Sequence, residues 1–373
     1  MSSPRLYFVV GEASGDLHAS NLMQAIKKKE PTTEFRFWGG DKMQQVAPNG
    51  LVKHINNLAF MGFWEVLKNI RTISKNLSFC KEDILSYQPD AIVFVDYPGF
   101  NLRIAEWAKQ KGIKVFYYIS PQVWAWKQSR VHKIKKVVDH MYVILPFEKE
   151  FYQRFDYEVN YVGHPLLDEI VKYNFSDKKE AFLKRNNLTN NPIIAVLPGS
   201  RKQEVSKKLP IMLEGIKSFS DYQIVIAGAP TLDEEFYAEF KGNTKIIYGE
   251  TYELLSNASV AVVTSGTATL ETALFKVPEV VCYKGSTLSY LIARQLIKVK
   301  YISLVNLIMD REVVRELIQN ECTAENIEQE VTKLLLKEEY RSVMLENYEE
   351  LKVVLGGGGA SEKVAQSLLM NLT

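Results

Sequence analysis

The sequence is poor in residues that bind metals or form disulfides. Its three cysteines are far apart and odd in number, and its five histidines are scattered over 373 residues. Neither set has the pairing of a disulfide framework or the spacing of zinc ligands, so the cysteines are interpreted as reduced, buried thiols. No Asp-x-Asp sequence occurs either, which leaves a divalent cation without obvious carboxylate ligands. We therefore predict neither a bound metal nor a cofactor.

Long apolar runs and a strong net charge are also missing. The first ten residues form only a short apolar segment before Glu12 and Asp16, which fits neither a signal peptide nor a membrane span. With 46 basic and 44 acidic residues, the net charge of +2 gives no field that indicates nucleic acid. A Walker-type Gly-Lys-Ser/Thr is absent, which argues against an NTPase. These absences favour a cytoplasmic protein with no nucleic-acid partner.

Short β-branched or aromatic runs alternate with helical patterns along the chain. The candidate strands are residues 6–10, 91–95, 114–119 and 140–145, followed by 193–197, 223–227, 245–248, 260–263 and 279–283. Such alternation predicts an α/β fold with parallel sheets covered by helices. The length exceeds what one growing core usually supports, so two domains are expected.

The domain boundary is placed where the first series of strands ends. Gly163-His164-Pro165 closes that series, and proline favours extended geometry in the residue before it, which suits a crossing between domains. We predict one domain over 1–165 and a second over 166–355. In the final segment, 356–373, four consecutive glycines form a flexible joint before a last amphipathic stretch.

Two loops of the first domain carry candidate chemistry, because parallel sheets bind ligands at the carboxyl ends of their strands. The first loop reads Gly11-Glu12-Ala13-Ser14-Gly15-Asp16, and Asp16 is expected to cap the following helix. Free amides at that helix start attract phosphate or sugar oxygens, which makes Glu12, Ser14 and Gly15 candidates for acceptor binding. The alternative is a plain glycine-assisted turn.

The second loop of this domain begins with Asp96, directly after the strand 91–95. A sugar hydroxyl that attacks a donor needs a nearby base to take its proton, and Asp96 is the first candidate for that base. Glu12 and His18 are weaker candidates. The alternative role for Asp96 is to cap the helix that follows.

The second domain repeats the arrangement twice. Pro198-Gly199-Ser200-Arg201 follows one strand, and its amides together with an arginine fork suit a diphosphate. Thr264-Ser265-Gly266-Thr267 follows another strand, and Glu271 one turn later can accept ribose hydroxyls. A surface turn and a capped helix start are the alternatives for these two loops.

Two segments indicate contact with a membrane surface. Apolar residues recur at helical spacing near lysine and arginine, and the candidates for membrane contact are Phe60, Met61, Phe63, Trp64 and Leu67. A basic run at 127–136 follows Trp124 and Trp126, and each cation near an anionic leaflet contributes about 1 kcal/mol. The alternatives are a helix packed on its own sheet and a solvated basic helix face.

Seven motifs in order along nearly the whole chain resemble the lipid-A-disaccharide synthase family. They are GEASGD at Gly11, MGFWEVL at Met61, ISPQVWAW at Ile119, LPFEKEFY at Leu145, VGHPLLD at Val162, LPGSR at Leu197 and SGTATLE at Ser265. The resemblance implies the GT-B architecture, in which two Rossmann-like domains face an interdomain cleft and the last helix often packs on the first domain.

The same resemblance implies a reaction and its site. Members of the family join UDP-2,3-diacylglucosamine to 2,3-diacylglucosamine 1-phosphate, with inversion and without a metal, and release UDP and the lipid A disaccharide 1-phosphate. Membership would place the chain at the inner-membrane surface as a peripheral monomer or homodimer. The family's nucleotide-sugar site would fall on Gly199, Ser200, Arg201, Ser265, Gly266, Thr267, Glu271 and Asn306.

Two other functions stay open on the sequence. A UDP-sugar epimerase can share this architecture and nucleotide site, but it needs no lipid-facing surface. An inactive sugar-nucleotide or lipid-binding protein is the other alternative, although the presence of both Asp96 and Arg201 favours an enzyme.

Overall fold

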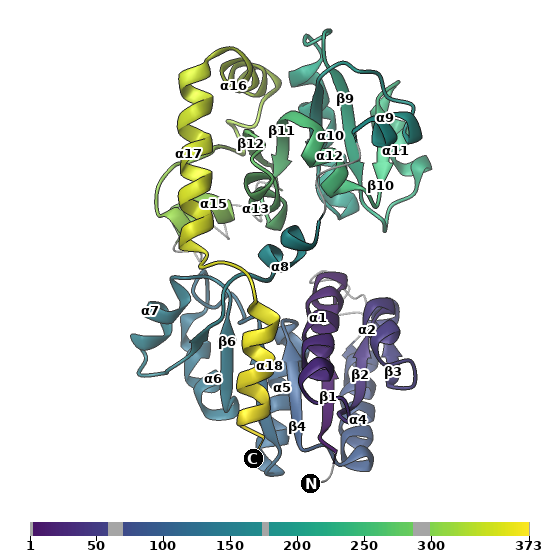
Figure 1. Cartoon of the computed structure of the whole chain (residues 1–373), viewed down its shortest axis with the longest axis vertical. Coiled ribbons are helices and arrows are strands. Elements are labelled where there is room, and N and C mark those ends of the chain that lie inside the picture. Colours follow the sequence, from purple (N-terminus) through teal and green to yellow (C-terminus); the bar gives the residue numbers. More distant parts are fainter. Residues whose placement is uncertain (1–2, 59–69, 174–178, 286–298, 373) are drawn as a thin grey trace. The chain divides into compact units, whose positions relative to one another are not determined.

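The computed structural model describes residues 3–58, 70–173, 179–285 and 299–372. It divides into two compact units, Met1–Asp168 with Gly357–Thr373, and Glu169–Gly356. Each unit contains one parallel sheet with helices packed on it (Figure 1). The predicted α/β class with two Rossmann-like domains is confirmed.

The sheet of the first unit has the strand order β3-β2-β1-β4-β5-β6-β7 in the described residues, and its neighbouring strands are parallel. The bounds are β1 Arg5–Val9, β2 Glu34–Gly39, β3 Leu51–His54, β4 Ala91–Val95, β5 Lys114–Tyr118, β6 His140–Val143 and β7 Asn160–Tyr161. The order reverses between β1 and β4, which is where open α/β sheets bind ligands. The sequence prediction contained β1, β4, β5 and β6 but missed β2, β3 and β7.

Helices cover both faces of this sheet. Their bounds are α1 Ala13–Lys29, α2 Asp41–Val46, α4 Ile70–Tyr87, α5 Pro98–Gln110, α6 Val131–Val137, α7 Glu148–Gln153, α8 Pro165–Lys172, which crosses the unit boundary, and α18 Ala360–Met370, with 3₁₀ turns η1 Ile55–Asn57 and η2 Gln128–Arg130. Leu6 and Phe8 on β1 face α1 and α18, whereas Tyr7 donates its hydroxyl to Asp83 of α4 at 2.7 Å. The strand alternation therefore gives each face its own layer of helices.

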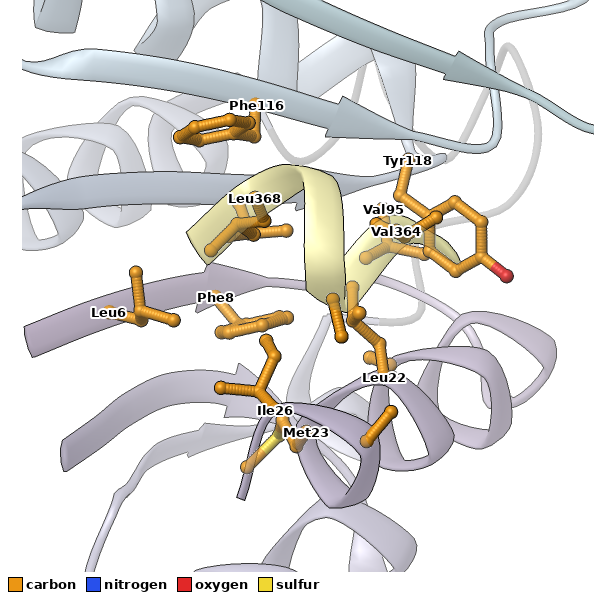
Figure 2. Packing of buried hydrophobic residues seen from close by; sticks show 14 of the residues in the cluster. Leu6, Phe8, Leu22, Met23, Ile26, Val95, Phe116, Tyr118, Val364 and Leu368 are labelled. Carbon is orange, nitrogen blue, oxygen red and sulfur yellow. The ribbon is translucent and has the colours of Figure 1, made fainter. Parts of the chain in front are cut away.

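The last helix, α18, belongs to the first unit although it comes from the far end of the chain. Val364 and Leu368 lie among Leu22 and Ile26 of α1 and the apolar side chains of β1 and β5 (Figure 2). Its first turn is capped by Asp168, whose carboxylate accepts hydrogen bonds from the amides of Gly359, Ala360 and Ser361. The glycine segment before α18 is thus anchored by a side chain of α8.

The second unit has the strand order β10-β9-β8-β11-β12-β13 in the described residues, again with parallel neighbours. The strands are β8 Ile193–Leu197, β9 Gln223–Gly228, β10 Lys245–Tyr248, β11 Ala258–Thr264, β12 Glu279–Tyr283 and β13 Arg315–Ile318. The helices are α9 Lys179–Arg185, α10 Lys202–Ile216, α11 Glu234–Lys241, α12 Thr251–Asn257, α13 Thr267–Leu274, α15 Leu304–Met309, α16 Ala324–Leu336 and α17 Glu338–Val354. All five strands predicted for this half are present, and β13 was missed.

The core of the second unit also lies on two faces of its sheet. Ile193, Ala195 and Leu197 of β8 pack with α9 and α12 on one face. On the opposite face α10 packs against α16. The three cysteines of the chain are free and buried. The strands of this sheet end at the loops that start α10 and α13, and these loops carry the candidate site.

Candidate active site

The loop after β1 is shaped by close contact with the loop after β4. A Cβ atom built on Gly11 would lie 2.3 Å from Cγ of Tyr97, so only glycine fits beneath that ring. A Cβ on Gly15 would lie 2.7 Å from Val10 Cγ1. Glu12 is half-buried at the start of α1, and Ser14 is exposed in its first turn. The structure thus brings together the two loops that the sequence selected in this unit.

Asp16 does not cap α1, contrary to the sequence prediction. It is buried inside α1, and its carboxylate accepts hydrogen bonds from the amides of Gly40 at 2.7 Å, Lys42 at 3.0 Å and Met43 at 3.2 Å. These amides belong to the start of α2, which therefore takes its cap from the neighbouring helix. Asp16 fixes α2 against α1 and so contributes to the framework around the loop.

Asp96 stands at the end of β4 in an unusual backbone conformation. Both Asp96 and Tyr97 have left-handed φ angles, +46° and +49°. Such strain persists where surrounding contacts enforce it. The Asp96 carbonyl oxygen accepts hydrogen bonds from the Tyr117 hydroxyl at 2.6 Å and from Asn101 Nδ2 at 2.7 Å. The turn therefore holds the Asp96 side chain at the strand end.

The electrostatics of Asp96 suit a base that works near neutral pH. Burial raises the pKa of its carboxyl to about 6, and the negative charge of Glu12 adds to the rise. A carboxylate with a raised pKa takes up a proton more readily than an ordinary one. His18, the other weak candidate, lies buried on α1, and its proximity adds to the burial that lowers the pKa of His164 to about 3.

The 198–201 loop of the second unit joins β8 to α10. Gly199 has a φ of +113°, and a Cβ on it would lie 2.7 Å from Glu204 Oε2 and 3.4 Å from Thr264 Cγ2. Ser200 is exposed, and the Arg201 side chain is 60% exposed with Nη1 3.7 Å from Glu204. Within the described residues this weak surface ion pair is the only one that engages the guanidinium, which leaves it free to meet an anion.

The 264–267 loop joins β11 to α13. The Ser265 hydroxyl donates to the Ile302 carbonyl at 2.8 Å, and Gly266, with a φ of +143°, is the N-cap residue of α13. Thr267 begins the helix. Glu271 accepts a hydrogen bond from the Tyr252 hydroxyl at 3.4 Å, and burial raises the pKa of its carboxyl. The two loops lie side by side, because they follow the paired strands β8 and β11, and a Cβ on Gly199 would lie 3.4 Å from Thr264 Cγ2.

Asn306 is buried in α15 with its polar groups already used. Its Nδ2 donates to the Val314 carbonyl at 2.8 Å and to Glu316 at 2.9 Å. Its Oδ1 accepts from the amides of Val313 at 2.7 Å and Val314 at 3.0 Å. These four bonds exhaust the capacity of a side-chain amide. Asn306 therefore holds the loop that leads into β13, and all of these partners belong to the second unit.

Lys208 and Glu148 are among the buried ionisable residues that the sequence reasoning missed. Lys208, on α10, donates to the Thr264 hydroxyl beneath the two loops of the second unit. Glu148, at the start of α7, accepts from the amides of Ile144 at 3.2 Å and Leu145 at 2.9 Å, and burial raises its pKa to about 7. The sequence feature that could have pointed to Lys208 was its position four residues after Glu204 and next to the apolar Leu209.

The sequence predicts no bound metal and predicts contact with a membrane surface, and the described residues bear on these two expectations only in part. In the described residues no group of three or more His, Cys, Asp or Glu side chains is placed to hold a metal ion. Within the same residues no helix is long and apolar enough to cross a bilayer. Phe60, Met61, Phe63, Trp64 and Leu67 lie outside the described residues.

The basic run at 127–136 is described and has two parts. Trp126 is 40% exposed, with Lys127 Nζ 4.6 Å and Arg130 Cζ 5.3 Å from its ring centroid. By contrast, Lys133 pairs with Glu106 at 2.7 Å, and Lys135 donates to the Phe155 carbonyl at 3.2 Å. The part in which an exposed aromatic ring stands beside two cations is therefore the Trp126 group, which we define as Trp126, Lys127 and Arg130.

Comparisons with known proteins give a consistent result. The family model described as lipid-A-disaccharide synthetase matches residues 6–366. A lipid-A-disaccharide synthase of Syntrophus aciditrophicus is 40% identical over 98% of this chain and 97% of its own length. One of Coxiella burnetii is 37% identical over 98% of each chain.

Solved structures resemble the chain in fold at much lower identity. A UDP-GlcNAc 2-epimerase from Neisseria meningitidis, solved with UDP-GlcNAc, aligns with a TM-score of 0.70 and 15% identity over 98% of this chain and 100% of that one. A glycotransferase of kitacinnamycin aligns with a TM-score of 0.67 and 11% identity over 100% of both chains. Transferases and epimerases thus share this fold, and the fold alone does not separate them.

Proposed function

The chain belongs to the lipid-A-disaccharide synthase family and is a UDP-sugar glycosyltransferase of lipid A biosynthesis; we propose that it joins UDP-2,3-diacylglucosamine to 2,3-diacylglucosamine 1-phosphate. The products are the lipid A disaccharide 1-phosphate and UDP. The observation that best supports a transfer reaction is Asp96, a half-buried carboxylate at a strand end with a pKa raised to about 6.

In the proposed reaction Asp96 is the general base. The acceptor hydroxyl oxygen attacks the anomeric carbon of the donor while its proton passes to Asp96. The bond from that carbon to the UDP oxygen breaks, and UDP leaves with the electron pair. One direct displacement inverts the configuration and needs a single base. Glu12, Ser14 and Gly15 bind the acceptor beside Asp96, at the start of α1.

The second unit is proposed to bind the nucleotide sugar. The 198–201 loop presents amides and the exposed Arg201, which meet the diphosphate and stabilise the charge of the leaving group. Ser265, Gly266 and Thr267 supply the start of α13, and Glu271 accepts the ribose hydroxyls. Asn306 contributes by holding the loop before β13.

We further propose peripheral binding to the inner-membrane surface through the Trp126 group and residues 60–67. An exposed tryptophan flanked by two cations suits the boundary between lipid headgroups and acyl chains. Substituting Lys127 and Arg130 by glutamine should reduce sedimentation with anionic liposomes at low salt, and high salt should release the wild type. Lys133→Gln is the matched control because Glu106 already neutralises that charge. Absence of any binding at low salt would refute the proposal.

The reaction is tested by UDP release from diacylated UDP-glucosamine, with and without the diacylglucosamine 1-phosphate acceptor. We expect release that depends on the acceptor, a disaccharide product, and no change with a chelator, because Arg201 and backbone amides supply the positive charge. Conversion of UDP-GlcNAc to its 2-epimer without acceptor would instead favour the epimerase. UDP binding without any turnover by folded protein would favour a binding protein.

A further inference from the structure

Lys208 is a buried cation with few partners. Its side chain is 3% exposed, and its ammonium donates to the Thr264 hydroxyl. Within the described residues no other hydrogen bond and no ion pair within 4 Å engages this ammonium, although it has three donors. A buried charge whose one hydrogen-bond partner is neutral costs free energy unless a group of opposite charge lies nearby.

The charged and titratable groups that face Lys208 come from three parts of the second unit, namely α10, β12 and the turn after β13. Glu204 lies one turn earlier on α10 and favours its charged form, and Arg201 at the start of that helix opposes it. The thiols of Cys282 on β12 and Cys322 after β13 also favour the charged form, but burial outweighs them and lowers the Lys208 pKa. Glu204 itself lies close to Arg201, at 3.7 Å. Glu204 therefore lies near two cations, Arg201 and Lys208, and its single carboxylate balances only one of these two positive charges.

The position of Lys208 ties it to both loops of the proposed donor site. It lies on α10, the helix that the 198–201 loop begins, and its bond ends on Thr264, the last residue of β11. Thr264 in turn contacts the position of Gly199. A single side chain thus links the helix after the first loop to the strand before the second.

Resting on the proposed function, we propose that Lys208 is a positioning residue of the donor site, which holds Thr264 beneath the two loops and whose positive charge is balanced by the diphosphate of the bound nucleotide sugar. Both loops begin helices, whose first amides attract anions, so a diphosphate bound there adds negative charge beside these two cations and one carboxylate. If Lys208 only supported the loops, its loss would lower the affinities for charged and uncharged ligands equally.

The test compares the affinities of UDP and uridine, measured by calorimetry on the full chain. Lys208→Met removes the charge, and Lys208→Gln removes it but keeps a donor for Thr264. We expect both variants to lose roughly 10- to 100-fold in UDP affinity, the range for hydrogen bonds to charged groups, and to bind uridine within about 2-fold of wild type. Lys208→Arg should restore part of the UDP affinity. Lys207→Met is the matched control, because Lys207 is the exposed neighbour on the same helix.

The outcomes separate the two proposals. If the wild type binds no UDP, the donor site itself is refuted and the role of Lys208 falls with it. If the wild type binds UDP and the variants bind it equally well, only the inference about Lys208 is refuted. Equal losses of UDP and uridine would also refute it, because they would show a structural role. If Lys208→Met does not fold, the affinities for UDP and uridine are compared in Lys208→Gln instead.

Discussion

At the scale of single residues, the candidate base Asp96 has several unusual features at once. Asp96 combines a left-handed backbone, a carbonyl held by Tyr117 and Asn101, and a pKa raised to about 6. Strained backbone and a raised pKa tend to occur together at functional sites. Removing the carboxylate without changing its shape is therefore the most direct test of its role.

Asp96→Asn should lower turnover by roughly 100-fold or more, because general base catalysis contributes on that scale. UDP affinity should stay near that of the wild type, since the proposed nucleotide site is in the other unit. Turnover is measured by acceptor-dependent UDP release, and binding by calorimetry. Near-normal turnover would remove Asp96 from the mechanism.

The pH dependence of turnover follows from the same residue. A base must be unprotonated, so activity should fall about tenfold per pH unit below the Asp96 pKa of about 6 and level off above it. Burial is the larger cause of the raised pKa and Glu12 the smaller. Glu12→Gln should therefore move the acidic limb of the profile of kcat to lower pH without bringing it to that of an ordinary aspartate. An unmoved limb would show that another group titrates.

At the scale of elements, the sequence predicted the buried strands well and the polar ones poorly. Residues 91–95 and 193–197 are continuous apolar runs, because strands buried on both faces need them. β2 carries Glu34 and Arg36, and β3 and β7 are short, so apolar patterning alone did not reveal them. β2 is a strand because it pairs with β1 on one side and β3 on the other.

Residue roles within the loops were less predictable than the loops themselves. Strand ends selected Asp96, the 198–201 loop and the 264–267 loop from local pattern. The partners of Asp16 are 24 to 27 residues away in sequence, and Lys208 meets Thr264 across 56 residues. Such contacts depend on tertiary packing, and no local spacing encodes them.

The cap of α18 gives a prediction at this scale. Asp168→Ala leaves the amides of Gly359, Ala360 and Ser361 without their acceptor, and losing a cap costs about 1–2 kcal/mol. We expect the unfolding temperature of the first unit to fall by a few degrees and amide exchange in 360–370 to accelerate. Gln366→Ala, at an exposed position of the same helix, is the control. Unchanged exchange in α18 would show that its apolar contacts alone hold it.

At the scale of the whole molecule, the chain builds two parallel-sheet units and returns to the first for its last helix. Each unit has its own core and its own strand-end loops. The candidate base, Asp96, lies in the first unit, and the loops at 198–201 and 264–267 that are proposed to bind the diphosphate lie in the second. We therefore expect the two substrates to slow amide hydrogen exchange in different units.

UDP alone should protect the second unit. Ligand at 100 times its Kd stabilises the state that binds it by about 2.7 kcal/mol, so amides at the starts of α10 and α13 should exchange more slowly. The loops at 11–16 and 96–101 should respond to the acceptor instead. Hydrogen exchange read by mass spectrometry measures both effects in one experiment. Arg201→Ala should weaken the protection by UDP at equal concentration, since it removes the guanidinium but keeps the amides. Protection by UDP confined to the loops of the first unit would reverse the assignment of donor and acceptor sites, because a bound diphosphate slows exchange first in the amides that hold it.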